Sequence, residues 1–471
     1  DNRFIVPARL SSFPLRKALA VVYLTITGFS DRQSKASSNM LQKDTIEFDN
    51  GPNSMKALLP RLSALGRNEA VTVSVLCGSS KALLIASVFR GGLRPHLVLL
   101  KDEECASEMA ADLRFFLGKE SVLFYPSTET LPFELAPPHE EICAERVATL
   151  HGLATGCPVV VVSAVPTLMQ CLPPKADFAA RALNLRVGGE YPREALIETL
   201  CAMGYARMSM VEDRAEMSAR GGILDIFPPA KDRPLRLEFF GDELESIRSF
   251  DIATQRSMKE LKEALILPAR EASPDKDSLS AARDALLDRA DALGLARQSW
   301  ETLSDKLKAG ASGLGMSPLL PLLYNKLDTI FDYLGADAVI TVIDPEAVKA
   351  AATGFAGDVS RATAKAVEKR RFFAAPEELY MSPDAFLKAM SGFSLVNVEP
   401  VIEAGFVLGA SARLNTEIRH ELNVSIGGKA SAGLDAPLAP LAERIKDRLE
   451  AGCRVWISAH NKGQAERTKE L

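Results

Sequence analysis

The clearest pattern of hydrophobic and polar positions along the chain lies between Arg220 and Ile247. Residues 223–227 carry apolar side chains at both alternate sets of positions, which predicts a mostly buried strand. Pro228 and Pro229 end that strand, because proline has no backbone N–H to donate to a neighbouring strand. Residues 235–240 predict a second strand with one regularly apolar face, made by Leu235, Leu237 and Phe239.

The opposite face of this second strand carries Arg236, Glu238 and Phe240, since side chains alternate between faces with a period of two. A large aromatic side chain on an otherwise charged face is poorly placed for the protein's own core. Arginine and aromatic side chains are enriched in protein-binding hot spots. The pattern leaves two interpretations open. Either this face binds a partner, or Phe240 packs under a loop while Arg236 pairs with Glu238 or Glu243.

Strands and helices alternate regularly from about residue 50 to about residue 170. The continuous apolar run Val159–Ser163 is typical of a parallel strand that helices cover on both faces. Cys105–Leu117 has the apolar spacing of an amphipathic helix. This alternation predicts an α/β fold with a doubly wound sheet. Ala338–Ile343 is a further buried run, which suggests that the chain later returns to the same sheet.

The pattern changes after Pro173-Pro174. Shorter strands such as Leu183–Val187 and one helix, Arg193–Met203, predict an inserted α+β domain with a mostly antiparallel sheet. A long helical stretch is predicted over Ser278–Ala309. We therefore divide the chain into an unmatched N-terminal extension at 1–45, the first half of the α/β domain at 46–178, the inserted sheet domain at 179–268, the second half of the α/β domain at 269–374, and a small C-terminal α/β domain at 375–471.

The last of these domains is predicted from a strand at Ser394–Val398, a helix at Leu438–Ala451 and a strand at Val455–Ser458. A helical pattern begins near Lys462 and runs to Leu471, so we expect this domain to be truncated. Residues 1–39 are expected to be either an upstream extension or the result of a mis-assigned start, and no function is predicted for them.

Composition places the chain among ordinary globular proteins, with 47% hydrophobic and 25% charged residues. The 56 basic and 61 acidic residues form no long basic stripe, so strong autonomous nucleic-acid binding is not indicated. The seven cysteines are scattered, which favours reduced thiols in a cytoplasm over a zinc site or a disulfide framework. No run approaches the ~20 apolar residues that a membrane-spanning helix requires.

A loop between a predicted strand and a predicted helix, residues 75–82, stands where a P-loop would lie. A working P-loop reads GxxxxGK[ST], because its glycines let backbone N–H groups approach phosphates and its hydroxyl ligates magnesium. Here Val75 and Ser80 replace the outer glycines, and Ala82 replaces the magnesium ligand. Only Gly78 and Lys81 remain. The loop predicts a degenerate nucleotide site without ATP hydrolysis, although a simple turn that begins a helix would look the same.

A metal or catalytic site is not indicated elsewhere. His139–Cys143 approaches the HExxH zinc pattern, but Cys143 stands where the second histidine is required and no third ligand is evident. Acidic residues at a helix start are better explained by the helix dipole. The other histidines form no recognisable triad, and Asp225 is interpreted as a sheet-edge or turn partner. We therefore predict no catalytic residue and no metal ligand.

Several segments together resemble the UvrB-homology module of the bacterial transcription-repair coupling factors, the Mfd family. The resemblance is carried by YPSTETLPFEL at 125–135, VVVVSAVPTLMQ at 159–170, Gly204–Tyr205, Arg220–Pro228 and Arg236–Glu243. It implies a helicase-like sheet whose nucleotide site is degenerate, interrupted by a sheet domain that docks the excision-repair protein UvrA. The positions that match the family's contact motif are Arg220, Arg236 and Phe240.

The resemblance also implies a role in transcription-coupled nucleotide-excision repair in the bacterial cytoplasm. The whole family protein is an ATP-dependent DNA translocase that displaces stalled RNA polymerase and recruits UvrA. Its ATP, magnesium, RNA polymerase and double-stranded DNA sites would lie in further domains, so no cofactor is expected in this segment, and a monomer is expected. The related protein UvrB has a long aromatic hairpin that inserts into DNA, whereas this chain has only the short loop Phe133–His139. The alternatives are an active P-loop NTPase or helicase domain, and a structural scaffold domain of a larger DNA enzyme.

Overall fold

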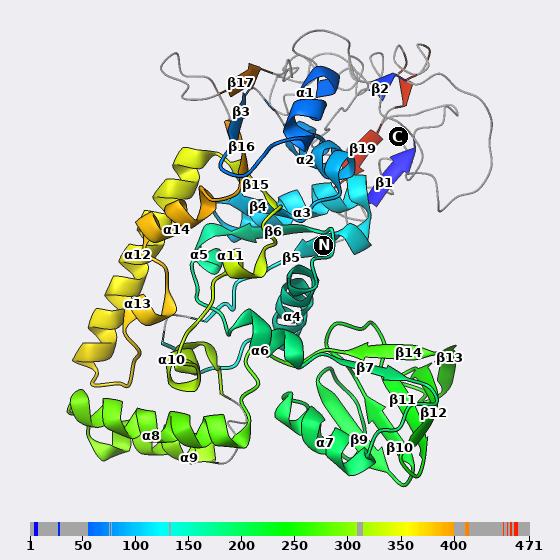
Figure 1. Ribbon diagram of the computed structural model, residues 1–471, viewed down its shortest axis with the longest axis vertical. Coiled ribbons are helices and arrows are strands. Elements are labelled where there is room, and N and C mark those ends of the chain that lie inside the picture. The colour runs from blue at the N-terminus through cyan, green and yellow to red at the C-terminus, as the bar shows by residue number, and fades with distance from the viewer. Residues whose placement is uncertain are drawn as a thin grey trace, which may run out of the picture.

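A parallel β-sheet of seven strands, in the order β17-β3-β16-β15-β4-β6-β5, organises the chain in the computed structural model (Figure 1). The structure describes residues 55–399 except 75, 77, 131–132 and 309–313, together with 4–7, 27–28, 410–413, 446, 450, 453–454 and 456–459. All neighbouring strands of this sheet run parallel. The strands are β3 (Ala70–Ser74), β4 (His96–Leu100), β5 (Val122–Phe124), β6 (Val160–Ala164), β15 (Val339–Ile343), β16 (Ser394–Glu399) and β17 (Ala410–Arg413).

Helices cover both faces of this sheet, because its central strands are apolar at nearly every position. Val160 and Val162 of β6 point into one core and Val161 points into the other, and all three are fully buried. The first core is formed with α1 (Met55–Ser63), α2 (Ser80–Gly92) and α3 (Glu103–Leu117), the last followed by the 3-10 turn Lys119–Ser121. The second is formed with α4 (Glu140–Ala154), α5 (Val165–Leu168), α6 (Lys175–Ala180), α11 (Ile330–Tyr333), α12 (Pro345–Glu368) and α14 (Pro383–Met390).

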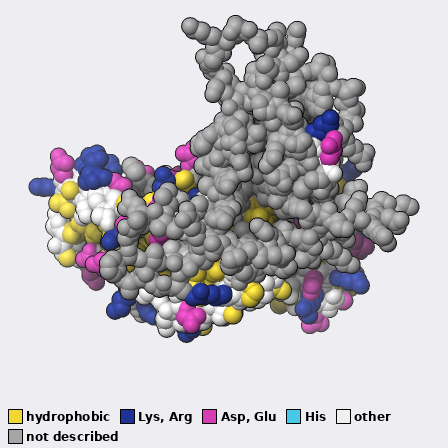
Figure 2. Space-filling model, turned by 90° about the horizontal axis from the view of Figure 1, so that it is seen from above, with side chains coloured by type: hydrophobic (Ala, Val, Ile, Leu, Met, Phe, Trp, Pro, Cys, Tyr) yellow, Lys and Arg dark blue, Asp and Glu magenta, His cyan; other side chains and the backbone are white. Residues whose placement is uncertain are grey.

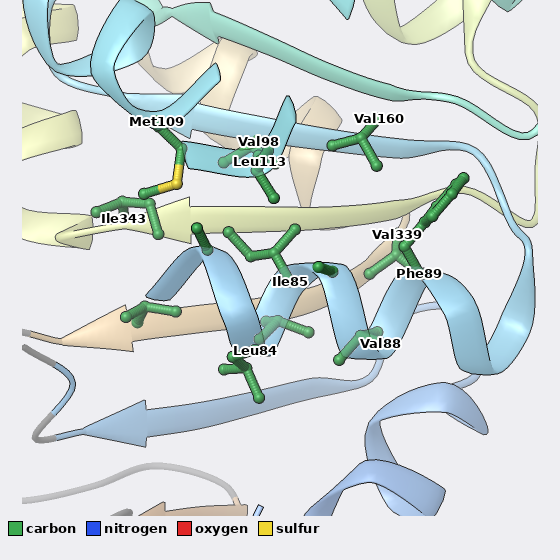
Figure 3. Packing of buried hydrophobic residues seen from close by; sticks show 14 of the residues in the cluster. Leu84, Ile85, Val88, Phe89, Val98, Met109, Leu113, Val160, Val339 and Ile343 are labelled. Atoms are coloured by element: carbon green, nitrogen blue, oxygen red, sulfur yellow. The ribbon is translucent and has the colours of Figure 1, made fainter. Parts of the chain in front are cut away.

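Helix α2 shows how the first core is filled. Its apolar stripe, which includes Leu84, Ile85, Val88 and Phe89, lies against the strand side chains in Figure 3. Met109 and Leu113 of α3 complete the same cluster. The predicted α/β class with a parallel, doubly covered sheet is confirmed in this coarse form.

Strand β16, which the sequence analysis assigns to a small C-terminal domain, belongs to this parallel sheet. It lies between β3 and β15 and pairs with both in parallel register. The predicted assignment of this strand is therefore wrong, because the hydrophobic pattern of a strand does not determine its place in the order of a parallel sheet. The predicted helix 438–451 lies outside the described residues except for 446 and 450.

Short strands at the chain's ends pair with one another. Strand β1 (Phe4–Pro7) pairs with β19 (Trp456–Ala459), and β2 (Thr27–Gly28) pairs with β18 (Cys453–Arg454), both antiparallel. These pairs bring segments from opposite ends of the sequence side by side.

Between β6 and β15 the chain leaves the parallel sheet and builds a mostly antiparallel one, in which only β8 and β9 pair in parallel, at the lower right of Figure 1. Six strands pair in the order β13-β12-β11-β10-β9-β8, and β7 pairs separately with β14. The strand predicted at Leu183–Val187 is therefore formed, but in the smaller sheet. The elements are β7 (Leu183–Arg186), α7 (Arg193–Ala202), β8 (Ala206–Arg207), β9 (Glu216–Arg220), β10 (Ile223–Ile226), β11 (Leu235–Phe240), β12 (Glu243–Phe250), β13 (Ser257–Leu261) and β14 (Glu263–Ile266).

A helical layer follows the antiparallel sheet. The helical stretch predicted over Ser278–Ala309 consists of two helices, α8 (Lys276–Ala292) and α9 (Arg297–Lys308), that pack on each other. Gly294 ends the first with a φ of +59°, a conformation that glycine adopts readily after a helix. Side chains of the 3-10 turn Ser317–Leu319, α10 (Leu320–Leu323) and α13 (Pro376–Leu379) pack in the same core as α8 and α9.

A buried ion pair ties the return segment after β14 to the parallel-sheet domain. Arg146 of α4 is 2% exposed and donates from Nε to Glu271 Oε1 at 2.8 Å. The guanidinium also donates to the main-chain oxygen of Pro126 at 2.7 Å and lies 4.2 Å from the ring centre of Tyr125. The hydroxyl of Tyr125 donates to Glu271 at 2.9 Å. Three segments distant in sequence are thus fixed at one point.

Charges of both signs are interspersed over the described periphery, where Lys and Arg side chains lie beside Asp and Glu side chains (Figure 2). None of the helices in the described part of the chain is long and apolar enough to cross a membrane.

Candidate functional site

The turn between β9 and β10 determines the geometry at one end of the antiparallel sheet. It consists of Gly221 and Gly222, and Gly221 has a φ of +55°, which favours glycine. A Cβ atom on Gly222 would lie 2.7 Å from the main-chain oxygen of Phe239. Any larger residue would push β10 away from β11. The glycine pair therefore lets the turn between β9 and β10 lie close to the main chain at the end of β11.

One face of the six-stranded sheet packs on helix α7. Leu224 of β10 and Leu237 of β11 are fully buried there, opposite each other in the strand register. Leu196, Ile197 and Leu200 of α7 belong to the same core cluster. The alternating apolar residues of β11 thus face inward, as the sequence pattern predicts.

The opposite face, which we call the recognition face, is not covered by a helix in the described part of the chain. It carries Phe240, whose side chain is 75% exposed, and Ile223, which is 37% exposed. Ile223 lies opposite Glu238 in the register, so Phe240 is its diagonal neighbour on the same face. The sequence pattern predicts a mostly buried strand at 223–227, and Ile223 is the exposed position of that segment because the recognition face is open at this end.

Arg236 lies on the recognition face in a fixed position. Its Nε and Nη2 atoms donate to both carboxylate oxygens of Asp225, at 2.8 and 2.9 Å, and Nη1 donates to the main-chain oxygen of Gln255 at 3.2 Å. The guanidinium carbon is 4.7 Å from the ring centre of Phe250. The hydrogen bonds to Asp225 raise the pKa of Arg236 further above its ordinary value.

The partner of Arg236 differs from the sequence-based alternative, which paired it with Glu238 or Glu243. Asp225 lies directly opposite Arg236 in the strand register, whereas Glu238 pairs with Arg248 at 3.2 Å. Asp225 is therefore a cross-strand partner within the sheet, not a turn residue.

Arg220 lies at the end of β9 beside the Gly221–Gly222 turn, and its side chain is exposed. Its Nε donates to the main-chain oxygen of Ser209 at 3.0 Å, and Nη2 donates to the same oxygen. Within the part of the chain that the structure describes, no carboxylate forms an ion pair with Arg220. The face therefore carries one arginine paired with a carboxylate and one that is not.

The structure places Arg220, Arg236 and Phe240 on one face, Arg220 at the end of β9 and the other two on β11, with β10 between these strands. Sequence reasoning missed Ile223 and the exposed Met208 and Met210, which precede and follow the Ser209 carbonyl that holds Arg220. The position of Ile223 next to a double glycine, at the end of its strand, was the signal for exposure. No sequence signal marked the methionines.

The loop predicted as a degenerate nucleotide site lies at the carboxyl end of β3, before α2, in the parallel sheet and separate from the recognition face. Gly78 has a φ of +53° and is exposed, and Ser80 and Lys81 begin the helix half-buried. Ala82 is fully buried in the first core, where its side chain offers no oxygen. Val75 lies outside the described residues.

The candidate metal ligand in the HExxH-like segment after His139 is the thiol of Cys143. Burial raises the pKa of Cys143 to about 11, which keeps its thiol protonated at neutral pH and makes it a poor metal ligand. Among the residues that can be described, no group of three His, Cys, Asp or Glu is close enough to hold a metal ion.

Comparison with known proteins matches the antiparallel part of the chain to a family model. Residues 183–271 match the UvrB interaction domain. This range begins at β7 and extends past β14, so it contains the six-stranded sheet, helix α7 and the recognition face. Several transcription-repair-coupling factors match a longer part of the sequence. The relative from Myxococcus xanthus is 32% identical over 429 residues, which are 86% of this chain and 35% of that protein.

The chain is related to the transcription-repair-coupling factors. The relative from Escherichia coli (strain K12) is 27% identical over 69% of this chain and 28% of its own length. The relative from Bacillus subtilis (strain 168) is 32% identical over 42% of this chain and 17% of its own length. The chain thus spans about a third or less of the relatives that it matches. The resemblance seen in the sequence is confirmed.

Proposed function

We propose that this chain is the part of a transcription-repair coupling factor that recruits UvrA in transcription-coupled nucleotide-excision repair. The observation that carries the proposal is the exposure of Phe240, 75%, on the sheet face that also carries Arg220 and Arg236. The match of the same residues to a UvrB interaction domain supports it.

The recognition face has the composition of a docking site. Phe240 and Ile223 offer apolar area beside each other, and burial of a phenylalanine side chain contributes about 1.5–3 kcal/mol. Arg220 and Arg236 offer directional donors at the edge of that area. Exposed methionines extend the apolar surface and can adapt to a partner.

The parallel-sheet domain serves in this proposal as a scaffold without nucleotide chemistry. A degenerate P-loop of a helicase-like domain is supported by Ala82, which is buried and lacks the hydroxyl that would ligate magnesium. We propose no ATP hydrolysis and no cofactor for this segment. The alternative of an active P-loop NTPase is disfavoured by the same residue.

In the intact protein we propose that further domains supply an ATP- and magnesium-dependent DNA translocase that binds RNA polymerase and double-stranded DNA. The names of the relatives support a role that couples transcription to repair. A bacterial cytoplasmic location and a monomeric state belong to the same proposal.

The proposal is tested by titrating purified UvrA with this chain in a calorimeter. We expect saturable binding, and we expect UvrB to compete, because the matched domain is named for UvrB. The contrary result is that UvrA does not bind the chain. The recognition face would then be a scaffold surface that packs on other domains of the intact protein, which is the second candidate function.

A further inference from the structure

The arginines of the recognition face differ in how their charges are compensated. Arg236 has a carboxylate partner on the adjacent strand, and Arg220 has only a main-chain carbonyl. Both residues belong to the proposed UvrA contact, so the chemistry assigned to each of them rests on that proposed function. The difference bears on what each arginine can recognise.

Arg236 and Asp225 form an electrically neutral unit. The pair is bidentate, its side chains are 19% and 13% exposed, and the carbonyl of Gln255 and the ring of Phe250 fix the guanidinium from other sides. The guanidinium is thus held before any partner arrives, which reduces the entropy lost on binding. The N–H groups that remain are oriented donors, but the nearby carboxylate cancels the net charge that would attract an anion.

Arg220 retains its net charge. The Ser209 carbonyl occupies Nε and one position on Nη2, so the Nη1 side of the fork remains open. An open end of a guanidinium matches the two oxygens of a carboxylate. The other ion pair on this face, Arg248 with Glu238, lies on β12 and β11, with β10 between it and Arg220.

We propose that Arg220 and Arg236 bind different chemical groups of UvrA. Arg220 binds a carboxylate, and Arg236 donates to a neutral oxygen, such as a main-chain carbonyl. Asp225 is the positioning residue that compensates the charge of Arg236 and holds its guanidinium in place. The face therefore gains its charge selectivity from Arg220 alone.

The contributions of Arg220 and Arg236 to the affinity for UvrA should differ in how they depend on salt concentration. Attraction between Arg220 and a partner carboxylate at the rim of an interface is screened when the Debye length falls from about 14 Å at low salt to about 4 Å near half-molar salt. A hydrogen bond from a neutral pair to a carbonyl has no comparable long-range component. The affinity lost with Arg220 should therefore depend on salt, and the affinity lost with Arg236 should not.

The experiment measures the Kd for UvrA at low and at high salt with the whole chain and its variants Arg220→Gln, Asp225→Asn and the double variant Arg236→Gln/Asp225→Asn. Arg283→Gln, at a half-buried position on α8 outside the sheet, is the matched control. Thermal unfolding of each variant shows whether it is folded at the binding temperature.

We expect Arg220→Gln to bind about tenfold more weakly at low salt, with most of that difference gone at high salt. The double variant Arg236→Gln/Asp225→Asn, which removes the donor without leaving an uncompensated Asp225 charge, should lose a similar factor at both salt concentrations. Asp225→Asn should bind with a steeper salt dependence than the wild type, because the charge of Arg236 is then no longer cancelled. Arg283→Gln should bind as the wild type does.

Equal salt dependence of the losses at Arg220 and Arg236 would overturn the proposal, as would an Asp225→Asn variant that melts lower but binds UvrA with unchanged salt dependence. A wild-type chain that does not bind UvrA would overturn the proposed function, and this inference with it. The wild-type titration therefore distinguishes the two failures.

Discussion

Leu237 and Phe240 lie on the same strand, β11, with their side chains on opposite faces of the sheet: Leu237 is fully buried against helix α7, and Phe240 is 75% exposed. Leu237→Ala should lower the free energy of unfolding by about 2–5 kcal/mol, because it leaves a cavity in the core. Phe240→Ala should change it by less than about 0.5 kcal/mol, as an exposed substitution does. Urea unfolding of both variants measures the contrast. A similar loss for both would mean that Phe240 is a core residue.

The buried contact between Arg146 and Glu271 predicts a large loss when one partner is removed. Glu271→Gln leaves the charge of Arg146 buried without compensation and should cost about 3–5 kcal/mol of unfolding free energy. The control is Asp358→Asn, which breaks an ion pair to Arg361 whose side chains are 60% and 70% exposed, and should cost less than about 1 kcal/mol. Equal melting temperatures for the two variants would show that the buried pair does not stabilise the junction.

His96 at the start of β4 predicts a pH dependence of stability. Burial lowers its pKa from 6.5 to about 3, and Arg94 adds to the shift, while the ring nitrogen Nε2 lies 2.6 Å from Thr341 Oγ1. The folded state disfavours the proton, so stability is fully present above pH 6.5 and falls as the pH drops from 6.5 toward about 3.

The slope of this loss should be about 1.4 kcal/mol per pH unit for one group. Unfolding measured from pH 7 downward should therefore be less pH-dependent in His96→Gln than in the wild type, whatever its stability at neutral pH. Parallel profiles for the two proteins would contradict the assignment.

The loop after β3 predicts no ATP turnover. Since Ala82 supplies no magnesium ligand, ATP should bind weakly or not at all, and Lys81→Ala should leave calorimetric titrations with ATP unchanged. The prediction fails if ATP binds with micromolar affinity, or if a measurable turnover disappears in Lys81→Ala.

Local patterns in the sequence predicted the strands of the site and the direction of their side chains, but not which residues contact each other across strands. The alternation of β11 identified Leu237 as inward and Phe240 as outward, because strand periodicity is a local property. Asp225 was not identified as the partner of Arg236, because their register depends on how the turn at 227–234 aligns two strands. The open face at Ile223 follows from which side helix α7 covers, and that is decided by tertiary packing.

The larger errors have the same origin. The apolar run of β16 predicted a buried strand correctly, but its place between β3 and β15 depends on contacts with strands more than fifty residues away in sequence. The break between α8 and α9 depends on the left-handed conformation of Gly294, in a stretch whose leucine spacing continues the helical pattern. Hydrophobic periodicity does not record either feature.

The central claim, that the recognition face docks UvrA, is tested most directly by the affinity of Phe240→Ala for UvrA. Truncation of a central hot-spot residue costs about 2 kcal/mol or more, so the variant should bind about thirtyfold more weakly than the wild type while melting at the same temperature. Val367→Ala, at a 57% exposed position on α12, should bind as the wild type does. If Phe240→Ala binds UvrA as tightly as the wild type, the recognition face is not the docking site.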